Sequence, residues 1–423
     1  MNKRLLLLLP VVMLLQCMTL FAQPLQESRA PRKDIDYTRL GRIDNLVNSY
    51  IEKGWVKGVV TLVVKGGEIV QYKGYGYADA ESKRAMRRDD LFRLASQTKA
   101  IVSTAIMILY EEGKFELDEP IANFLPTFRN PRVLKEFHAA DSSYTTEPAK
   151  RDITFRDLLT HTSGIDYAGI GSEKMRAIYA KAGIPTGLGV VEYDLKDRME
   201  ALGRLPLIHQ PGEKWTYSLG IDVLGCLVEV ISGKNLEEFC TERIFLPLGM
   251  KDTYFNVPAS KASRLTAVYS EDSLHHVIRW SKERTSIDPD YPVKKKHYFS
   301  GGAGLTATAY DYAIFLQMML NGGKFNGVKI LSPRTVQMMT SGQLTFPFNG
   351  VDNMGLGFGI TSELSGARGP RNAGSFSWGG YFGTTYWADP KAGLVCLIMT
   401  QQNPNTHGDI MGKVEQLIYQ SLQ

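Results

Sequence analysis

The chain has 423 residues, of which 43% are hydrophobic and 22% are charged, so it can bury the core of one large or two ordinary domains. Its formal net charge is only +5, and Lys3 and Arg4 near the N-terminus contribute part of that excess. This near balance of acidic and basic side chains argues against a nucleic-acid partner.

The N-terminal segment has the pattern of a secretory signal peptide. Residues 1–22 combine two early basic residues, an apolar run and a small residue, Ala22, at the end. We expect cleavage near Ala22 and an exported protein, periplasmic in a bacterium or secreted, with no stable membrane span in its mature form, because a span needs about 20 apolar residues. A lipoprotein signal at Cys17 is the less favoured alternative, since Gln16 fits such a cleavage site poorly.

Cysteine and histidine usage predicts neither a metal nor a cofactor. Three cysteines follow the signal segment, Cys226, Cys240 and Cys396, and their spacing matches no zinc or redox motif. A disulfide framework is not required, and whether any two of them pair is left open. The seven histidines are scattered along the chain.

The first elements after the signal segment form a helix and a hairpin. Residues 23–35 read as a polar tether, and apolar residues then recur at helical spacing over 40–51, ending at Gly54. Two β-branched runs, 59–64 and 68–72, flank a glycine turn and predict antiparallel strands.

The last third mirrors this arrangement. Strand patterns at 384–388 and 394–399 surround a turn at 389–393, and a helix with one apolar face covers 410–418. We therefore expect both chain ends to share one sheet. The predicted fold class is α+β: an antiparallel β-sheet flanked by N- and C-terminal helices, with an inserted mainly helical domain.

The expected domain division follows from this pattern. Residues 36–112 and 291–423 form the sheet domain, and residues 113–290 form the mainly helical domain. Within the helical part, 126–150 and 164–190 read as loop-rich segments, and no strand series is expected there.

Ser96 and Lys99 stand at the start of a helix that is apolar on nearly every side, residues 100–110. Residues three apart share one helix face, so the lysine amine could accept the proton of the serine hydroxyl. The alternative is that Ser96 caps the helix and Lys99 extends into solvent.

Two later stretches carry further chemistry. Tyr217 precedes an apolar helix at 221–231, where it could relay a proton or only pack with its hydroxyl bonded to backbone. Trp378, Gly379 and Gly380 lie in a strand, where paired glycines admit another backbone or a ligand, unless they form an ordinary bulge.

With these three stretches in this order, the chain resembles the serine β-lactamase-like superfamily, the fold of class C β-lactamases and penicillin-binding proteins, and in particular the family VIII carboxylesterases, over roughly residues 38–420. Further stretches that support the resemblance are His161-Thr162-Ser163-Gly164-Ile165, Pro211-Gly212-Glu213, Ile231-Ser232-Gly233-Lys234 and Gly301-Gly302-Ala303-Gly304. The resemblance implies a structural turn at His161.

The resemblance also assigns the catalytic roles. Ser96 is the acylated nucleophile, Lys99 its activating partner, and Tyr217 the residue that relays a proton to the leaving group and activates the deacylating water. Which of Lys99 and Tyr217 is the formal base stays open. The oxyanion hole maps to the backbone N–H groups of Ser96 and Tyr381.

Two departures from the β-lactamase pattern bear on the substrate. Leu219 stands where those enzymes have the asparagine of Tyr-x-Asn, and it cannot form a hydrogen bond. Trp378, followed by Gly379 and Gly380, replaces Lys-Thr-Gly, so a neutral indole stands in place of an ammonium that would bind a carboxylate. We expect all four residues to contribute to substrate binding.

These features predict a serine hydrolase that forms a covalent acyl-enzyme, and specifically a carboxylesterase acting on small, uncharged acyl esters. A β-lactamase, D-alanyl peptidase or D-aminopeptidase-type amide hydrolase is the first alternative, and a non-catalytic binding protein of the same fold is the second. The expected partner is a small-molecule ester or amide.

Overall fold

The computed structural model describes residues 25–285 and 287–423. The predicted signal peptide over 1–22, its cleavage point and Cys17 lie outside the described residues. Across the described part of the chain, none of the helices has the length and apolar character needed to cross a membrane.

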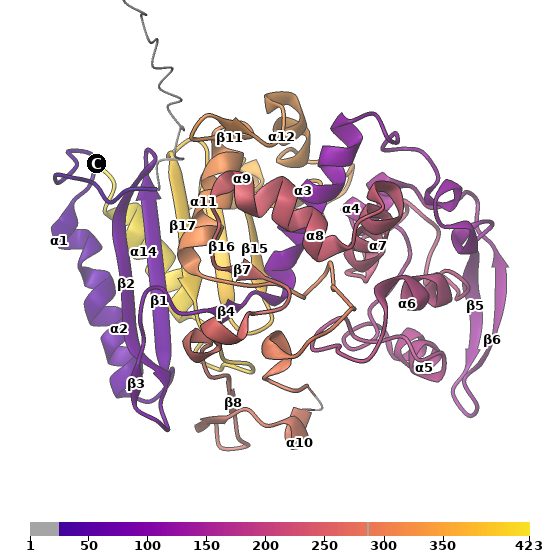
Figure 1. Ribbon diagram of the computed structural model, residues 1–423, viewed down its shortest axis with the longest axis horizontal. Helices are drawn as coiled ribbons and strands as arrows, with labels where there is room; N and C mark the ends of the chain where they lie inside the picture. The colour runs from indigo at the N-terminus through magenta and orange to yellow at the C-terminus, as the bar shows by residue number, and fades with distance from the viewer. Residues whose placement is uncertain (1–24, 286) are drawn as a thin grey trace, which may run out of the picture.

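An eight-stranded antiparallel sheet forms the centre of the molecule. Its strands, in spatial order, are β13 (Asn353–Met354), β14 (Gly359–Ile360), β15 (Phe376–Gly380), β16 (Thr384–Asp389), β17 (Leu394–Met399), β1 (Gly58–Lys65), β2 (Glu68–Asp79) and β3 (Arg84–Ala85). Strand β1 pairs with β17 from Val60 opposite Met399 to Lys65 opposite Leu394. Figure 1 shows the indigo N-terminal strands beside the yellow C-terminal ones, so the prediction that both chain ends share one sheet is confirmed.

Each face of the sheet packs against helices, because alternate residues of β1 point to opposite sides. Val59 and Val63 join a core formed with the terminal helices α1 (Tyr37–Leu40), α2 (Arg42–Glu52) and α14 (Ile410–Gln420). Val60, Leu62 and Val64 join the larger core on the other face, which includes α3 (Thr98–Glu111) and α11 (Ala309–Leu320). The predicted α+β fold class, with terminal helices flanking the sheet, is confirmed.

A second group of helices lies beside the sheet, around the buried helix α7 (Gly220–Ser232). Its other members are α4 (Phe155–Leu159), α5 (Glu173–Lys181), α6 (Leu195–Leu202), α8 (Leu236–Cys240) and α9 (Leu246–Leu248). The described helices α10 (Lys282–Thr285), α12 (Pro333–Met339) and α13 (Glu363–Arg368) are short and lie outside this group. The division into domains at residues 113 and 290 stays a prediction.

Short strands occur where the sequence predicts none. Residues 126–150, expected to be loop-rich, contain the hairpin of β5 (Arg132–His138) and β6 (Ser143–Pro148), which Figure 1 shows at the edge of the molecule. Most residues of this hairpin are exposed, so no alternation of apolar and polar residues marks it in the sequence. Of the remaining short strands, three form one sheet: β4 (Phe92–Arg93), β10 (Thr306–Ala307) and β7 (Thr253–Tyr254). Strand β8 (Tyr269–Glu271) pairs with β9 (Val277–Arg279), and β11 (Lys324–Phe325) pairs with β12 (Val328–Lys329).

The described part of the expected tether, from Leu25 to Ile35, packs on the sheet domain. Leu25 is buried, the Ser28 N–H donates to the Ile69 carbonyl, and Ile35 forms a bridge with Leu422. The sequence does not predict this packing, because most of these contacts are made by the backbone and leave no pattern in residue type. The three cysteines that follow, Cys226, Cys240 and Cys396, are all free and buried.

Candidate active site

Ser96 lies in a tight turn between β4 and α3. The turn is a 3₁₀ segment, Ala95–Gln97, held by a hydrogen bond from the Leu94 N–H to the Leu305 carbonyl at 2.9 Å. Ala95 has a φ of 45°, a left-handed conformation that is uncommon without glycine and recurs at functional sites. Helix α3 starts at Thr98 with no side-chain cap, so the alternative that Ser96 caps this helix is wrong.

The structure brings Ser96, Lys99 and Tyr217 together from two helix entrances. The Tyr217 hydroxyl donates to Ser96 Oγ at 2.6 Å, and Lys99 Nζ donates to the same oxygen at 3.3 Å. Lys99 is only 2% exposed, and its Nζ also donates to the Gly302 carbonyl at 2.8 Å. The alternative that Lys99 extends into solvent is therefore wrong. A hydroxyl with two proton-transfer groups in reach fits an activated nucleophile.

Aromatic rings and one carboxyl group surround the lysine. Lys99 Nζ lies 4.6 Å from the ring centroid of Tyr217 and 5.5 Å from that of Tyr167. On helix α7, Asp222 is fully buried; burial raises the pKa of its carboxyl, while a hydrogen bond from Ser300 and the charge of Lys99 lower it. Neither Tyr167 nor Asp222 was predicted from the sequence, although an aspartate in the apolar segment 221–231 was an available signal.

Gly302 lies against Lys99 and Asp222 so closely that no side chain fits at its position. A Cβ at this position would lie 2.4 Å from Asp222 Oδ2 and 3.4 Å from Lys99 Nζ. The glycine backbone can therefore approach the lysine and accept its hydrogen bond. The Gly302 carbonyl thus gives Lys99 a polar partner, which the Leu219 side chain cannot provide.

His161 lies behind Tyr217 rather than at the nucleophile. It is fully buried, its Nδ1 lies 2.9 Å from Ser218 Oγ, and its carbonyl accepts from the Thr216 N–H at 2.8 Å. Burial, with a smaller contribution from the charge of Lys99, holds the pKa of His161 well below its usual range. Both hydrogen bonds go to the neighbours of Tyr217, which fits the structural role expected for His161.

The end of β15 approaches the nucleophile turn through Gly380. A Cβ at Gly380 would stand 2.3 Å from the Leu94 carbonyl oxygen and 2.2 Å from Thr384 Oγ1. Only glycine permits this close approach, which brings the next residue, Tyr381, to the cavity that Ser96 lines. At Gly379 the nearest atom to an added Cβ, the Thr384 carbonyl oxygen, is 3.5 Å away.

The other residues predicted to bind substrate, Leu219, Trp378 and Gly379, do not line the cavity that Ser96 lines. Leu219 is fully buried at the start of α7, so its side chain is not available to a ligand. The Trp378 ring lies 5.9 Å from the Tyr217 ring and 6.1 Å from the Phe348 ring, and Trp378 and Gly379 line a neighbouring cavity of about 600 Å³.

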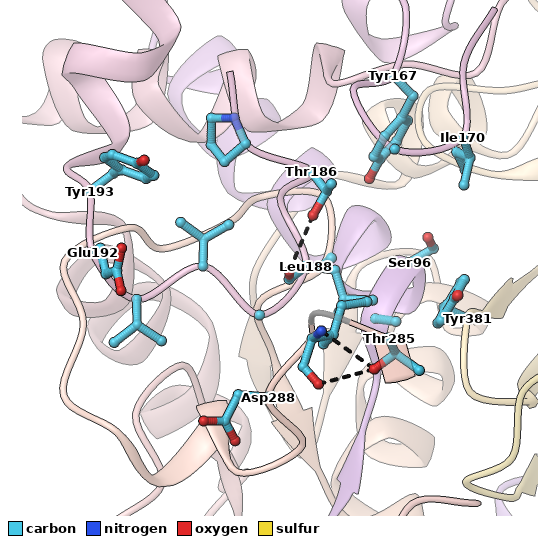
Figure 2. A pocket seen from close by; sticks show the side chains of 18 of the residues that line it. Ser96, Tyr167, Ile170, Thr186, Leu188, Glu192, Tyr193, Thr285, Asp288 and Tyr381 are labelled. Carbon is cyan, nitrogen blue, oxygen red and sulfur yellow. Dashed lines mark hydrogen bonds between the residues drawn. The ribbon is translucent and has the colours of Figure 1, made fainter. Parts of the chain in front are cut away.

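A cavity of about 610 Å³ opens directly beside Ser96. Ser96, Tyr217 and Tyr381 line one part of it, and residues of the loop 185–193, of helix α10 and of the segment 287–294 supply much of the rest. Figure 2 shows Ser96 and Tyr381 on one side of this cavity, with Glu192 and Tyr193 on the opposite side. This volume falls in the range of pockets for drug-sized ligands.

Comparison with known proteins gives consistent matches over most of the chain. A family model described as Beta-lactamase matches residues 43–420. Protein Rv1367c of Mycobacterium tuberculosis is 35% identical over 87% of this chain and 91% of its own length, and Esterase EstB of Burkholderia gladioli is 32% identical over 85% and 89%. The solved structure of EstCE1, a hydrolase with promiscuous acyltransferase activity, superposes with a TM-score of 0.75 at 25% identity, covering 90% of this chain and 99% of that one.

Proposed function

The chain belongs to the beta-lactamase family of serine hydrolases, and from that premise we propose that it is a carboxylesterase for uncharged acyl esters. The observation that carries the proposal is the Ser96 hydroxyl, held between Tyr217 and the buried Lys99 at the wall of a cavity. The similarity to Esterase EstB supports the same class of substrate.

In the proposed reaction, Ser96 Oγ attacks the ester carbonyl carbon while its proton passes to Tyr217 or Lys99. The backbone N–H groups of Ser96 and Tyr381 stabilise the negative oxygen of the tetrahedral intermediate. The alcohol then leaves with the proton, and the acyl group stays on Ser96. Water, activated by the same two side chains, attacks the acyl-enzyme and releases the carboxylic acid.

The preference for esters rests on Trp378. An indole at this position offers a neutral donor and an apolar face, whereas a substrate carboxylate calls for a cation. The ring neighbours of Trp378 are Tyr217, Phe348 and His161, of which the buried His161 favours its neutral form. These contacts favour an uncharged group beside Tyr217.

A rate panel on the purified protein tests the proposal. Wild type, Ser96→Ala and Ser103→Ala are assayed with p-nitrophenyl esters, nitrocefin and a D-alanyl amide. Ser103 lies on the same helix and is fully buried, and its hydroxyl has no hydrogen-bond partner among the described residues, so Ser103→Ala is the matched control. We expect ester turnover in wild type and Ser103→Ala and none above background in Ser96→Ala.

Other outcomes decide between the alternatives. Fast nitrocefin or D-alanyl amide hydrolysis with slow ester hydrolysis would replace the esterase proposal by the amide-hydrolase alternative. Absence of turnover together with failure of a fluorophosphonate probe to label Ser96 would favour a non-catalytic binding protein. Export through the predicted signal peptide is a further part of this proposal, and mass spectrometry of the N-terminus of the mature protein tests it.

A further inference from the structure

The volume of the cavity beside Ser96 is larger than a small acyl group requires. Figure 2 places Leu188 between the Ser96 side and the side that carries Glu192 and Tyr193. At about 610 Å³ its volume compares with sites that enclose drug-sized ligands, far above what an acetyl group fills. The part of the substrate that enters it must therefore be extended.

The apolar part of the cavity packs on a buried aromatic cluster. Leu188, Val191 and Ile287 line it and pack on a buried cluster that includes Trp280 and Phe382. The Trp280 indole N–H donates to the Ile287 carbonyl at 3.0 Å. Because this wall is packed and hydrogen-bonded from behind, an apolar chain meets a preformed surface.

The two loops that form the cavity also meet closely at a glycine. Gly189 has a φ of 71°, and a Cβ there would stand 2.9 Å from Ile287 Cγ2. The buried Arg93, two residues before Ala95, donates through Nε to the Pro289 carbonyl at 2.7 Å and so ties the second loop to the nucleophile strand. The distance from nucleophile to apolar wall is thereby fixed by contacts.

Charged side chains also line the cavity, so only part of its wall is apolar. Asp288 and Lys294, which form an ion pair, and the exposed Glu192 all line the cavity. An apolar chain that reached these groups would remove them from water, which is costly. This arrangement favours chains that end before the charges.

The position of Tyr217 indicates which half of an ester enters this cavity. The leaving oxygen must take a proton, so it lies next to the Tyr217 hydroxyl, while the carbonyl oxygen points to the N–H groups of Ser96 and Tyr381. Tyr217 lines both the cavity beside Ser96 and, with Trp215, a separate cavity of about 410 Å³, and we assign the alcohol to the side of the second cavity. The acyl chain is then the part that extends toward Leu188.

We propose that the cavity lined by Leu188, Val191 and Ile287 is an acyl-chain pocket that selects esters of medium-length aliphatic acids over acetates. This inference rests on the proposed esterase function. It also widens the sequence-based prediction of a small acyl group, because that prediction used no information on the loops.

Two substrate series test the pocket. In the first, the acyl group varies at constant alcohol, p-nitrophenyl acetate against p-nitrophenyl octanoate; in the second, the alcohol varies at constant acyl group, ethyl acetate against octyl acetate. Leu188→Trp fills the apolar wall, and Leu246→Trp, at a position 70% exposed on α9, is the matched control. We expect Leu188→Trp to lower the octanoate-to-acetate ratio of kcat/KM by about tenfold or more, because even single methylenes change such ratios tenfold in a pocket. The alcohol series and Leu246→Trp should keep the wild-type ratios.

The same protein gives a readout that does not need ester turnover. Fluorophosphonates with a short and a long alkyl chain are compared by their rates of labelling Ser96. Faster labelling by the long-chain probe in wild type, lost in Leu188→Trp, supports the pocket even if no ester is hydrolysed, an outcome that would reject only the esterase proposal. A change confined to the alcohol series, or equal labelling by both probes, overturns the acyl-chain pocket.

Discussion

Gly380→Ala is expected to lower kcat/KM for an aryl ester by about 10²-fold, through a backbone displacement rather than through any lost functional group. The added Cβ would stand 2.3 Å from the Leu94 carbonyl oxygen, whereas real Cβ atoms essentially never approach a heavy atom within 3.0 Å. The end of β15 and the nucleophile turn must therefore separate by at least about 0.7 Å, and a misplacement of about 1 Å can cost about 10²-fold in rate. Tyr381, whose N–H is the proposed second oxyanion donor, moves with this strand end.

The assay compares Gly380→Ala with Gly379→Ala, one residue earlier on the same strand. At Gly379 the nearest atom to an added Cβ is 3.5 Å away, an ordinary contact, so Gly379→Ala should lose only a small part of that activity. Steady-state kinetics with a p-nitrophenyl ester and thermal unfolding are measured for both variants. Wild-type kcat/KM in a folded Gly380→Ala protein, or equal losses in the two variants, would refute the argument that close approach positions the oxyanion hole.

Two further substitutions test the site. Tyr217→Phe removes the hydroxyl 2.6 Å from Ser96 Oγ but keeps the ring contacts, so kcat should fall by about 10²–10⁴-fold with an unchanged melting temperature, and a fall in both would contradict the relay role. At His161, burial lowers the pKa of the folded state below that of the unfolded state. The full free energy of unfolding is therefore present above about pH 6.5, the ordinary pKa of histidine. As the pH falls below this value, the free energy of unfolding decreases by up to about 1.4 kcal/mol per pH unit. In urea unfolding between pH 7 and pH 5, His161→Gln should show a smaller loss of stability than wild type. If the free energy of unfolding depends on pH with the same slope in both proteins, His161 is excluded as a source of this pH dependence.

The structure brings together Ser96, Lys99 and Tyr217, which the sequence singled out, while their catalytic roles stay predictions. Ser96 and Lys99 share a helix face and Tyr217 precedes an apolar helix, but each pattern alone also fits a non-catalytic role, so the roles were assigned through the family resemblance. The sequence does not indicate that Lys99 contacts the Gly302 carbonyl, or that Asp222 lies near Lys99. Those depend on how α3 and α7 pack, and a carbonyl acceptor leaves no trace in residue identity.

The residues that line the substrate cavity were predicted less well, because their positions also depend on how distant segments pack. Leu219 was interpreted from its place in a motif, but the start of α7 turns its side chain into the core. The acyl-chain pocket is formed by Leu188, Val191 and Ile287, whose loops have no helix or strand period that would place them opposite Ser96. The exposed hairpin of β5 and β6 was missed because most of its residues face solvent and leave no apolar alternation.

The pairing of β1 with β17 has a consequence for the order in which the protein is assembled during translation. Strand β1 is synthesised long before its hydrogen-bonding neighbour on one side, β17. Strand β15, which ends at Gly380, is likewise a late product, and contacts between such distant segments form slowly. A nascent chain that already contains Ser96 and Lys99 therefore still lacks the strand end at Gly380 that packs against Leu94, so these contacts form only after β15 has been synthesised.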